Sequence, residues 1–422
     1  MRYELPKEVE EVLKKLAQEG FQAYIVGGAV RDLLMGKKVS DWDFTTDAKP
    51  EEILKVFPKG FYDNKFGTVG IAVEKVGGAE ERSRASTAAN ETSEDAPEIP
   101  ERQDPLSEGI FEITTMRKEG IYQDFRHPTE VSWTDKIEED LARRDFTINA
   151  LALRLTPFAQ GKPSEYEVSD PFQGQRDLEN KLIRAVGNPN LRFQEDALRL
   201  MRAIRIAAQL EFAIEEKTWQ AIRENSHLLS QIAWERIRDE LFKILCSMNP
   251  RPGGQAYIGI VKLREAGILA VILPELERCF GVVQEGPKHT RVYDIGEHSL
   301  LTLQNTPSSN PLVRLAALLH DIGKPDTMKT DPSGNVTFYN HEVAGGRLIL
   351  QIAKRFNLSK AQTDKLFRLV RWHLFTVDER QTDSAIRRFI KNVGLENIEE
   401  MMALRVGDRL GGGTQRAVSW RM

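Results

Sequence analysis

The sequence predicts an α+β protein in which a mixed head is followed by two helical regions. Over the first part of the chain, helix patterns alternate with short β-rich runs. After Asp177 apolar residues recur at helical spacing, as in "FQEDALRLMRAIRIAAQL" and "WERIRDELFKILCS". From about Pro274 a second helical region holds five of the seven histidines. We therefore divide the 422 residues into a head (1–155), a helical neck and body (156–273) and a helical tail domain (274–422).

Composition and cysteine use narrow the class of protein. With 41% hydrophobic and 29% charged residues, the chain has no apolar run near the ~18 residues that a membrane helix needs. The N-terminal "MRYELPKEVEEVLKKLAQEG" is an acidic amphipathic helix pattern rather than a secretory signal. Cys246 and Cys279 provide neither a disulfide framework nor a four-cysteine zinc site. We expect a cytoplasmic protein with no membrane contact, whose oligomeric state stays open.

The net charge of -4 is unevenly distributed. The stretch from Ala79 to Gly109 contains nine acidic and three basic residues, a local balance of -6 that leaves +2 for the rest of the chain. This stretch has almost no large apolar side chain, so we expect a disordered acidic insert. The acidic total therefore does not exclude a nucleic-acid partner.

Local signals define the elements of the head. A helix over 10–20 is closed by Gly20, and a helix over 50–58 begins with Pro50 at a favoured first-turn position. Between them we expect the strand "FQAYIVGG", the helix "AVRDLLMG" and the strand "SDWDFTTD". "FGTVGIAV" and "FEITTMR" then predict a hairpin with the acidic insert at its tip.

Asp41 and Asp43 are the first candidate catalytic residues. Because they lie two residues apart on a predicted strand, their carboxylates point to the same side, whereas Trp42 and Phe44 face the core. Such a pair can hold two Mg²⁺ ions, which stabilise the attacking and leaving oxygens of a phosphoryl displacement. For an isolated pair, two ordinary aspartates on an exposed strand edge are the alternative.

Glycines and arginines elsewhere in the head suit a phosphate-bearing substrate. Gly27 and Gly28 fall between a strand and a helix, where backbone N–H groups can face an anion, and Arg31 follows one turn later. A second charged group precedes the apolar run of "DLARRDFTINALAL": Arg143, Arg144 and Asp145. These adjacent charges are either a solvated helix start or a substrate clamp.

Three strings occur in order along the chain: "GGAVRDLLMGKKVSDWDFTT", "EGIYQDFRHPTEVSWTDKIEEDLARRDFTINALAL" and "RFQEDALRLMRAIRIAAQL". Together they resemble the class II tRNA nucleotidyltransferase and bacterial poly(A) polymerase family over residues 21–269. The resemblance implies a polymerase-β-like nucleotidyltransferase head whose Asp41 and Asp43 ligate the catalytic metals. It also implies that Gly28 and Arg31 contact the incoming triphosphate, and that residues 143–145 bind ribose and phosphates.

The resemblance further implies a protein template for the incoming base. In "EDALRLMRAIR", Asp196 and Arg199 would hydrogen-bond the Watson–Crick edge of ATP or CTP, and Arg202 and Arg205 would orient or support them. Asp196, Arg199 and Arg202 fall at i, i+3 and i+6, so on one helix they would share a face. Without the resemblance, this spacing is typical of a solvated, ion-paired face.

Other features bear on the activity within the family. A flexible loop over 124–135, which in the family helps the switch from CTP to ATP, favours complete CCA addition to the tRNA 3′ end. Glu112 on "FEITTMR" is a candidate third carboxylate, and tRNA would lie along "KLIRAVGNPNLRF" and the arginines after Glu195. The alternatives are a poly(A) polymerase or A-adding enzyme of the same family, a metal-dependent phosphohydrolase whose head grips RNA, and a non-catalytic RNA-binding protein.

The tail contains a second constellation of candidate ligands: His298, His320 with Asp321, His341, His373 and Asp408. Histidine and carboxylate suit a transition metal, and the His-Asp pair ends an apolar helix pattern. The motifs resemble the HD phosphohydrolase superfamily.

This second resemblance implies core ligands at His298, His320, Asp321 and Asp408, for a divalent transition metal or Mg²⁺. His341 and His373 would extend the site to a second metal. A metal-activated water would attack a phosphoester, with a phosphatase or 2′,3′-cyclic phosphodiesterase activity on RNA ends or nucleotides. An HD fold kept as a scaffold for RNA is the alternative. Relatives commonly continue into a further helical tail, so the sequence after Asp408 is short by comparison.

Overall fold

A computed structural model describes residues 5–412, apart from 40, 63–66, 73–109, 121–130, 156–165, 248–253, 285–293, 333, 335 and 376–380. The predicted acidic insert and most of the predicted loop over 124–135 lie outside the described residues. The chain forms two compact units, one from Met1–Ile121 with Pro128–Asn180 and the other from Tyr122–His127 with Lys181–Met422.

The first unit is built on a seven-stranded sheet with the order β3-β4-β5-β2-β1-β8-β9. The strands are β1 (Ala23–Val26), β2 (Asp43–Thr46), β3 (Phe61–Tyr62), β4 (Thr68–Ala72), β5 (Ile110–Thr115), β8 (Ala152–Leu155) and β9 (Tyr166–Ser169). β2 and β5 are parallel, and the other neighbouring strands are antiparallel. The predicted hairpin is confirmed, because β4 pairs with β5.

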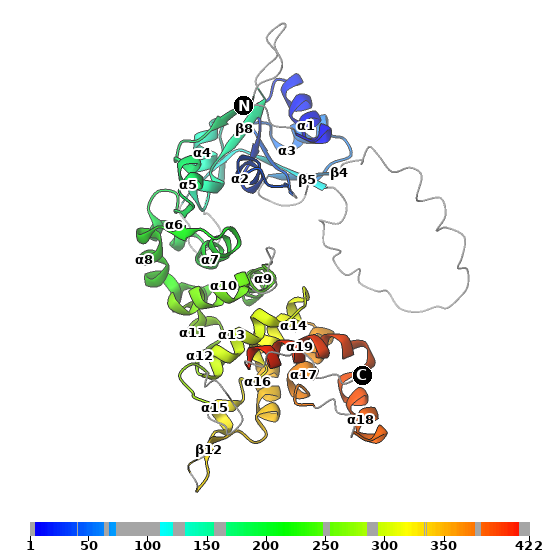
Figure 1. Cartoon of the computed structure of the whole chain (residues 1–422). Helices are drawn as coiled ribbons and strands as arrows, with labels where there is room; N and C mark the ends of the chain where they lie inside the picture. The colour runs from blue at the N-terminus through cyan, green and yellow to red at the C-terminus, as the bar shows by residue number, and fades with distance from the viewer. Residues whose placement is uncertain are drawn as a thin grey trace, which may run out of the picture. The chain divides into compact units, whose positions relative to one another are not determined.

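Helices and a small hairpin complete this unit (Figure 1). They are α1 (Lys7–Gln18), α2 (Gly28–Leu34), α3 (Pro50–Val56), α4 (Ile137–Ala142), α5 (Gly174–Glu179), the 3₁₀ turn η3 (Thr147–Asn149), and the paired strands β6 (Arg117–Glu119) and β7 (Val131–Trp133). Apolar residues of α1 and α3 pack with one face of the sheet in a single core. Trp42 and Phe44 belong to this core, 8% and 1% exposed, which confirms their predicted inward orientation.

The head extends beyond the boundary expected at Leu155. β9 pairs with β8 from Ala152↔Ser169 to Leu155↔Tyr166, so the sheet gains its last strand after that point. Since α5 also belongs to the first unit, the unit ends at Asn180. The expected neck and tail regions meanwhile share the second unit.

The second unit is mainly helical (Figure 1). Its helices are α6 (Pro189–Glu195), α7 (Leu198–Leu210), α8 (Glu216–Asn225), α9 (Trp234–Leu245), α10 (Gly254–Glu265), α11 (Ile268–Ile272), α12 (Pro274–Glu277), α13 (Ile295–Asn305), α14 (Pro311–Leu319), α15 (Lys324–Thr327), α16 (His341–Arg355), α17 (Lys360–Arg371), α18 (Asp383–Val393) and α19 (Ile398–Gly411). Short 3₁₀ turns are η4 (Ser226–Gln231) and η5 (Leu395–Asn397), and two small sheets pair β10 (Leu182–Ile183) with β11 (Ala213–Ile214) and β12 (Lys329–Thr330) with β13 (Val336–Thr337).

The helix expected through "FQEDALRLMRAIRIAAQL" is interrupted at Asp196. Its backbone is extended, with φ -143° and ψ 103°, between the end of α6 and the start of α7. Asp196 Oδ1 accepts a hydrogen bond from the Leu198 amide at 3.1 Å. An aspartate that caps a new helix in this way competes with continuation of the preceding one, so the expectation of one continuous helix is wrong here.

Within the described part of the chain, no helix is both long and apolar enough to cross a membrane.

Candidate active site and metal centre

The aspartate pair lies at the beginning of β2. Asp43 is the first residue of the strand, whereas Asp41 precedes it and is exposed. Asp43 pairs with Glu112 of the parallel strand β5, and paired residues of neighbouring strands project to the same face. The structure therefore places a third carboxylate beside Asp43, on the face opposite the core that buries Phe44.

Gly27 forms the turn that joins β1 to α2 next to Asp43. Its backbone has φ 74° and ψ -137°, a conformation that suits glycine. A Cβ at this position would lie 3.1 Å from Arg144 Nη1 and 3.7 Å from Asp43 Oδ2. Glycine thus allows the backbone to approach both a guanidinium group and a predicted catalytic carboxylate.

We expect Gly27→Ala to destabilise the head and to impair its reaction. The positive φ costs a side-chain-bearing residue about 1–3 kcal/mol, and the new methyl group would also displace Arg144. Gly36→Ala is the matched control, because Gly36 has φ 65° but a Cβ there would have no neighbour within 4 Å. Denaturant unfolding should show a loss for both variants, whereas the nucleotide incorporation that the sequence resemblance implies should fall for Gly27→Ala alone. Equal incorporation by the two variants would contradict this explanation.

Arg143 and Arg144 are held by a carboxylate that the sequence analysis did not single out. Asp140 on α4 is fully buried and accepts hydrogen bonds from Arg143 Nε at 2.9 Å and Nη2 at 2.7 Å. Its second oxygen lies 3.4 Å from Arg144 Nη2. Burial would raise the pKa of Asp140, but the two arginines hold it below its ordinary value. Asp140 is therefore ionised and anchors both guanidinium groups.

Arg31 and Asp145 are connected through Asn149. Arg31 donates to both carboxylate oxygens of Asp32, at 2.8 and 3.0 Å, and from Nη1 to Asn149 Oδ1 at 2.9 Å. Asn149 in turn donates to Asp145 Oδ1 at 3.2 Å. A Cβ added at Gly28 would lie 3.4 Å from Arg31 Nη2. Arg31 and Asp145 thus belong to one hydrogen-bonded group, and Arg143 and Arg144 to a second one around Asp140.

In the second unit, Asp196 is fixed by an arginine from another helix. Arg236 of α9 donates from Nη2 to Asp196 Oδ2 at 2.8 Å, while Asp196 Oδ1 caps α7. Arg236 Nη1 is buried and has no hydrogen-bond partner among the described residues. This contact joins residues 40 positions apart, and no local sequence pattern indicates it.

The predicted arginines of α7 have separate environments. Arg199 Nη1 donates to the Arg192 carbonyl at 3.1 Å and to Glu195 Oε2 at 2.6 Å. Arg205 donates to buried Glu240 of α9 and to Gln209. Arg202 lies on α7 between them. The structure therefore brings Asp196 and Arg199 to the junction of α6 and α7, whereas Arg205 joins α7 to α9.

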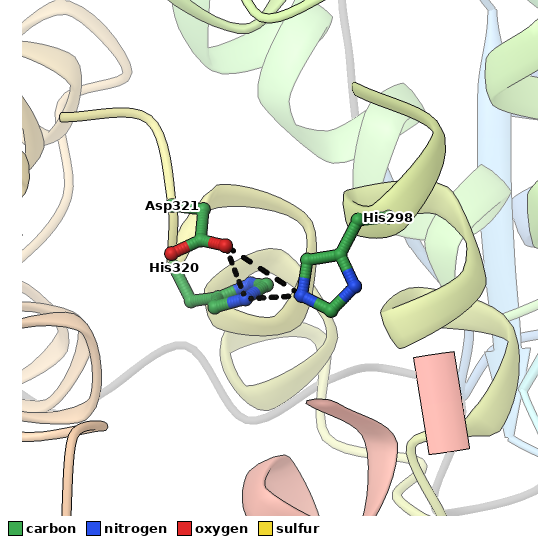
Figure 2. A group of neighbouring side chains, drawn as sticks. All are labelled: His298, His320 and Asp321. Atoms are coloured by element: carbon green, nitrogen blue, oxygen red, sulfur yellow. Dashed lines mark hydrogen bonds and ion pairs between the residues drawn. The ribbon is translucent and has the colours of Figure 1, made fainter. Parts of the chain in front are cut away.

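His298, His320 and Asp321 converge in the tail (Figure 2). His298 belongs to α13, while His320 and Asp321 directly follow α14. The Nε2 atoms of the two histidines are 3.2 Å apart, and Asp321 Oδ2 lies 3.1 Å from that of His320. Asp408 of α19 brings Oδ1 to 3.2 Å from His298 Nε2. The four residues predicted as core ligands therefore face one another.

A second group shares Asp321 with the first. Asp321 Oδ1 lies 3.2 Å from His341 Nε2 and 3.7 Å from His373 Nε2. His341 begins α16 and His373 follows α17, and their Nε2 atoms are 3.4 Å apart. Each Asp321 oxygen thus faces one pair of histidines. This arrangement fits two cations bridged by one carboxylate.

Backbone carbonyls select the histidine tautomers at this centre. The Nδ1 atoms of His320, His341 and His373 lie 2.9, 2.8 and 2.7 Å from backbone carbonyl oxygens. Because a carbonyl can only accept, each Nδ1 must donate, so that Nε2 of a neutral ring keeps its lone pair. The Nε2 lone pairs of neighbouring histidines then point at one another across about 3 Å, which is the arrangement of ligand atoms around a metal ion.

Electrostatics favour the ligand forms of Asp321 and His373, whereas at His320 burial is outweighed by Asp321 and Asp408, which raise its pKa, so a cation must displace a proton from that ring. Burial opposes ionisation of Asp321, but His320 and Lys324 hold its pKa well below the ordinary value. Lys324 Nζ lies 2.7 Å from Asp321 Oδ2. Burial, together with neighbouring His320, lowers the pKa of His373 to about 4, so this ring is neutral at pH 7. An ionised carboxylate and a neutral imidazole are the forms that bind a divalent cation.

The fold and these groups of side chains define the class: a polymerase-type nucleotidyltransferase head joined to a helical HD domain. Three family models match the chain in this order: "Poly A polymerase head domain" over residues 23–184, "Probable RNA and SrmB- binding site of polymerase A" over 211–280, and "HD domain" over 291–410. The chain therefore carries a poly(A) polymerase-type head, the RNA-binding region of such polymerases and an HD domain, in this order.

Curated relatives of the chain are CCA-adding enzymes. The chain is 42% identical over 269 residues to the CCA-adding enzyme of Enterococcus faecalis, with 62% of this chain and 56% of that protein covered. It is 40% identical over 253 residues to that of Ligilactobacillus salivarius, with 60% and 52% covered. The chain therefore spans about half the length of the curated relatives it matches.

Solved structures show the same fold. The CCA-adding enzyme of Bacillus stearothermophilus in complex with CTP matches with a TM-score of 0.62 and 24% identity, covering 95% of this chain and 77% of that one. A CCA-adding enzyme with ATP matches with a TM-score of 0.58 and 22% identity, covering 94% and 76%.

Proposed function

We propose that this protein adds CMP and AMP from CTP and ATP to the 3′ end of tRNA, as a CCA-adding nucleotidyltransferase. The observation that carries the proposal is the junction of Asp43, Gly27 and Arg144 at one end of the sheet, in a chain similar to CCA-adding enzymes. Carboxylates and a guanidinium group at one point match the two needs of phosphoryl transfer, which are metal binding and neutralisation of phosphate charge.

In this proposal Asp41 and Asp43 hold Mg²⁺, with Glu112 positioned to contribute a third carboxylate. Mg²⁺ takes oxygen ligands, which fits this donor set, and when bound it neutralises charge on the attacking and leaving oxygens. Arg144 beside Gly27 contacts the triphosphate, and Arg31 beside Gly28 contacts it as well. Arg143 and Asp145 complete the grip on phosphates and ribose.

Base selection falls to the junction of α6 and α7. Asp196 accepts and Arg199 donates, so together they match the donor and acceptor edges of cytosine or adenine. Arg236 supports this role by fixing Asp196, while Arg202 and Arg205 support α7. tRNA would lie along "KLIRAVGNPNLRF", which contains β10 and most of α6, and along the arginines after Glu195.

We expect Arg199→Ala to reduce discrimination between CTP and UTP by about tenfold or more, because hydrogen bonds to a charged group contribute about 1.5–3 kcal/mol. Incorporation of each nucleotide, measured separately, would give the ratio. Arg223→Ala is the control, since Arg223 is exposed on the neighbouring helix α8. An unchanged CTP:UTP ratio would remove Arg199 from the template.

The decisive experiment supplies labelled CTP and ATP, separately and together, to tRNA ending before C74, to tRNA ending after C75 and to a non-tRNA oligonucleotide. Two C residues followed by one A, on tRNA alone, are expected. Addition of A only after C75 would indicate an A-adding enzyme, and a long A tail on any RNA would indicate a poly(A) polymerase. Release of phosphate without extension would leave the hydrolase alternative.

A second activity is favoured by the tail. His298, His320, Asp321 and Asp408 fit a divalent transition metal, and His341 with His373 fit a second one. A bound metal would supply a hydroxide nucleophile at neutral pH for hydrolysis of a phosphoester at an RNA end or nucleotide. Lys324, beside Asp321, adds a positive charge at the same centre.

A further inference from the structure

Asp140 is a carboxylate without solvent exposure that contacts two arginines, Arg143 and Arg144. Arg144 in turn lies at Gly27, next to the start of β2. The Asp140 side chain is 0% exposed, and those of Arg143 and Arg144 are each 19% exposed. Asp140 Oδ1 takes two hydrogen bonds from Arg143 and one from the Arg117 amide at 3.3 Å, while Oδ2 faces Arg144. The Asp140 carboxylate thus accepts from the Arg117 amide and from two guanidinium groups, and it orients these side chains.

Arg144 spans the distance between this carboxylate and the glycine turn. Its Nη2 faces Asp140, and its Nη1 lies against Gly27, where an added Cβ would be 3.1 Å from Nη1 and 3.7 Å from Asp43 Oδ2. Its Nε is buried and has no hydrogen-bond partner among the described residues. Because a guanidinium group is planar, fixing Nη2 on Asp140 also fixes the direction of Nη1.

We propose that Asp140 is a positioning residue, which holds Arg144 toward the triphosphate of the incoming nucleotide and away from Asp43. The inference rests on the proposed nucleotidyl transfer and deepens it. Without the Asp140 charge, Asp43 is the nearby carboxylate that would attract the Arg144 guanidinium, in competition with Mg²⁺. Asp140 would then act through Arg144 on triphosphate binding and have no part in reading the base.

The test compares Asp140→Asn with Glu138→Gln, a charge-neutralising control at an exposed position of the same helix. For Asp140→Asn we expect KM to rise about tenfold for CTP and for ATP alike, the scale of one misdirected charge-assisted hydrogen bond. The ratio of CTP to UTP use should stay unchanged, unlike that of Arg199→Ala. Equal KM values in Asp140→Asn and wild type would overturn the proposal.

Calorimetric titration with tripolyphosphate and Mg²⁺ separates this inference from the proposed function. Wild type should bind tripolyphosphate, and Asp140→Asn should bind it about tenfold more weakly even if no nucleotide is ever incorporated. Adding Asp140→Asn to a variant that already carries Arg143→Ala and Arg144→Ala should cause no further loss, since Asp140 acts through these two arginines. No binding by wild type, or additive losses, would refute the positioning role.

Removal of a buried charge can prevent folding, so a second variant keeps Asp140 in place. Arg144→Lys retains the positive charge, but an ammonium group cannot reach Asp140 and Gly27 at once as the guanidinium fork does. Tripolyphosphate binding should again weaken by about tenfold. Wild-type affinity in a folded Arg144→Lys protein would show that the orientation of the fork does not matter.

Discussion

Replacement of both Asp41 and Asp43 by alanine should abolish nucleotide incorporation, with a loss of about a thousandfold or more. Metal ions contribute several kcal/mol of charge stabilisation to phosphoryl transfer, and each 1.36 kcal/mol corresponds to a factor of ten in rate. Labelled CTP with tRNA ending before C74 provides the measurement. Asp43 begins β2 and Asp41 is exposed before it, so neither substitution removes a side chain from the core.

Two comparisons make this result specific. Glu51→Gln alters an exposed carboxylate of α3 in the same unit and should retain wild-type incorporation. Glu112→Gln should have an intermediate effect, because Glu112 is the register partner of Asp43 but not one of the pair. Full incorporation by the double alanine variant would exclude the head as the site of nucleotidyl transfer.

The alternation of side chains in "SDWDFT" was sufficient to predict the face on which Asp43 lies, whereas Asp41 precedes β2 and its shared orientation stays a prediction. Trp42 and Phe44 are buried, and side chains of a strand alternate between its two faces. The same alternation therefore indicates which residues face the core and which face the candidate site. Asp140 carried a usable signal as well, because Arg143 and Arg144 follow it at i+3 and i+4. The sequence analysis did not use that spacing.

Other features depend on long-range packing and have no local signal. The break at Asp196 reflects the preference of aspartate for helix caps, which outweighed a good helical pattern on both sides. The support from Arg236 comes from α9, and only the folded chain brings it to Asp196. In the tail, the residue types of the candidate ligands were evident, but the central place of Asp321 follows from the meeting of separate helices.

Asp321→Asn should remove metal binding from the tail while leaving nucleotide addition intact. Among the residues that the structure describes, Asp321 is the one whose two oxygens face both histidine pairs, so loss of its charge weakens the binding of both proposed cations. We expect affinity for Mn²⁺ or Co²⁺ to fall by about 100-fold or more, since ligation by a charged carboxylate exceeds the 10–100-fold effect typical of a supporting residue. The isosteric amide leaves the packing around His320 and His341 in place.

Elemental analysis after dialysis against Mn²⁺ or Co²⁺ would measure this loss, and hydrolysis of 2′,3′-cyclic AMP would report the proposed second activity. Asp326→Asn is the matched control, because Asp326 is exposed and pairs with Arg278 at 3.0 Å outside the centre. It should keep wild-type metal content. If Asp321→Asn bound metal as wild type does, Asp321 could not bridge the two groups. If it lost metal but kept hydrolysis, the phosphohydrolase activity would have to lie elsewhere in the chain.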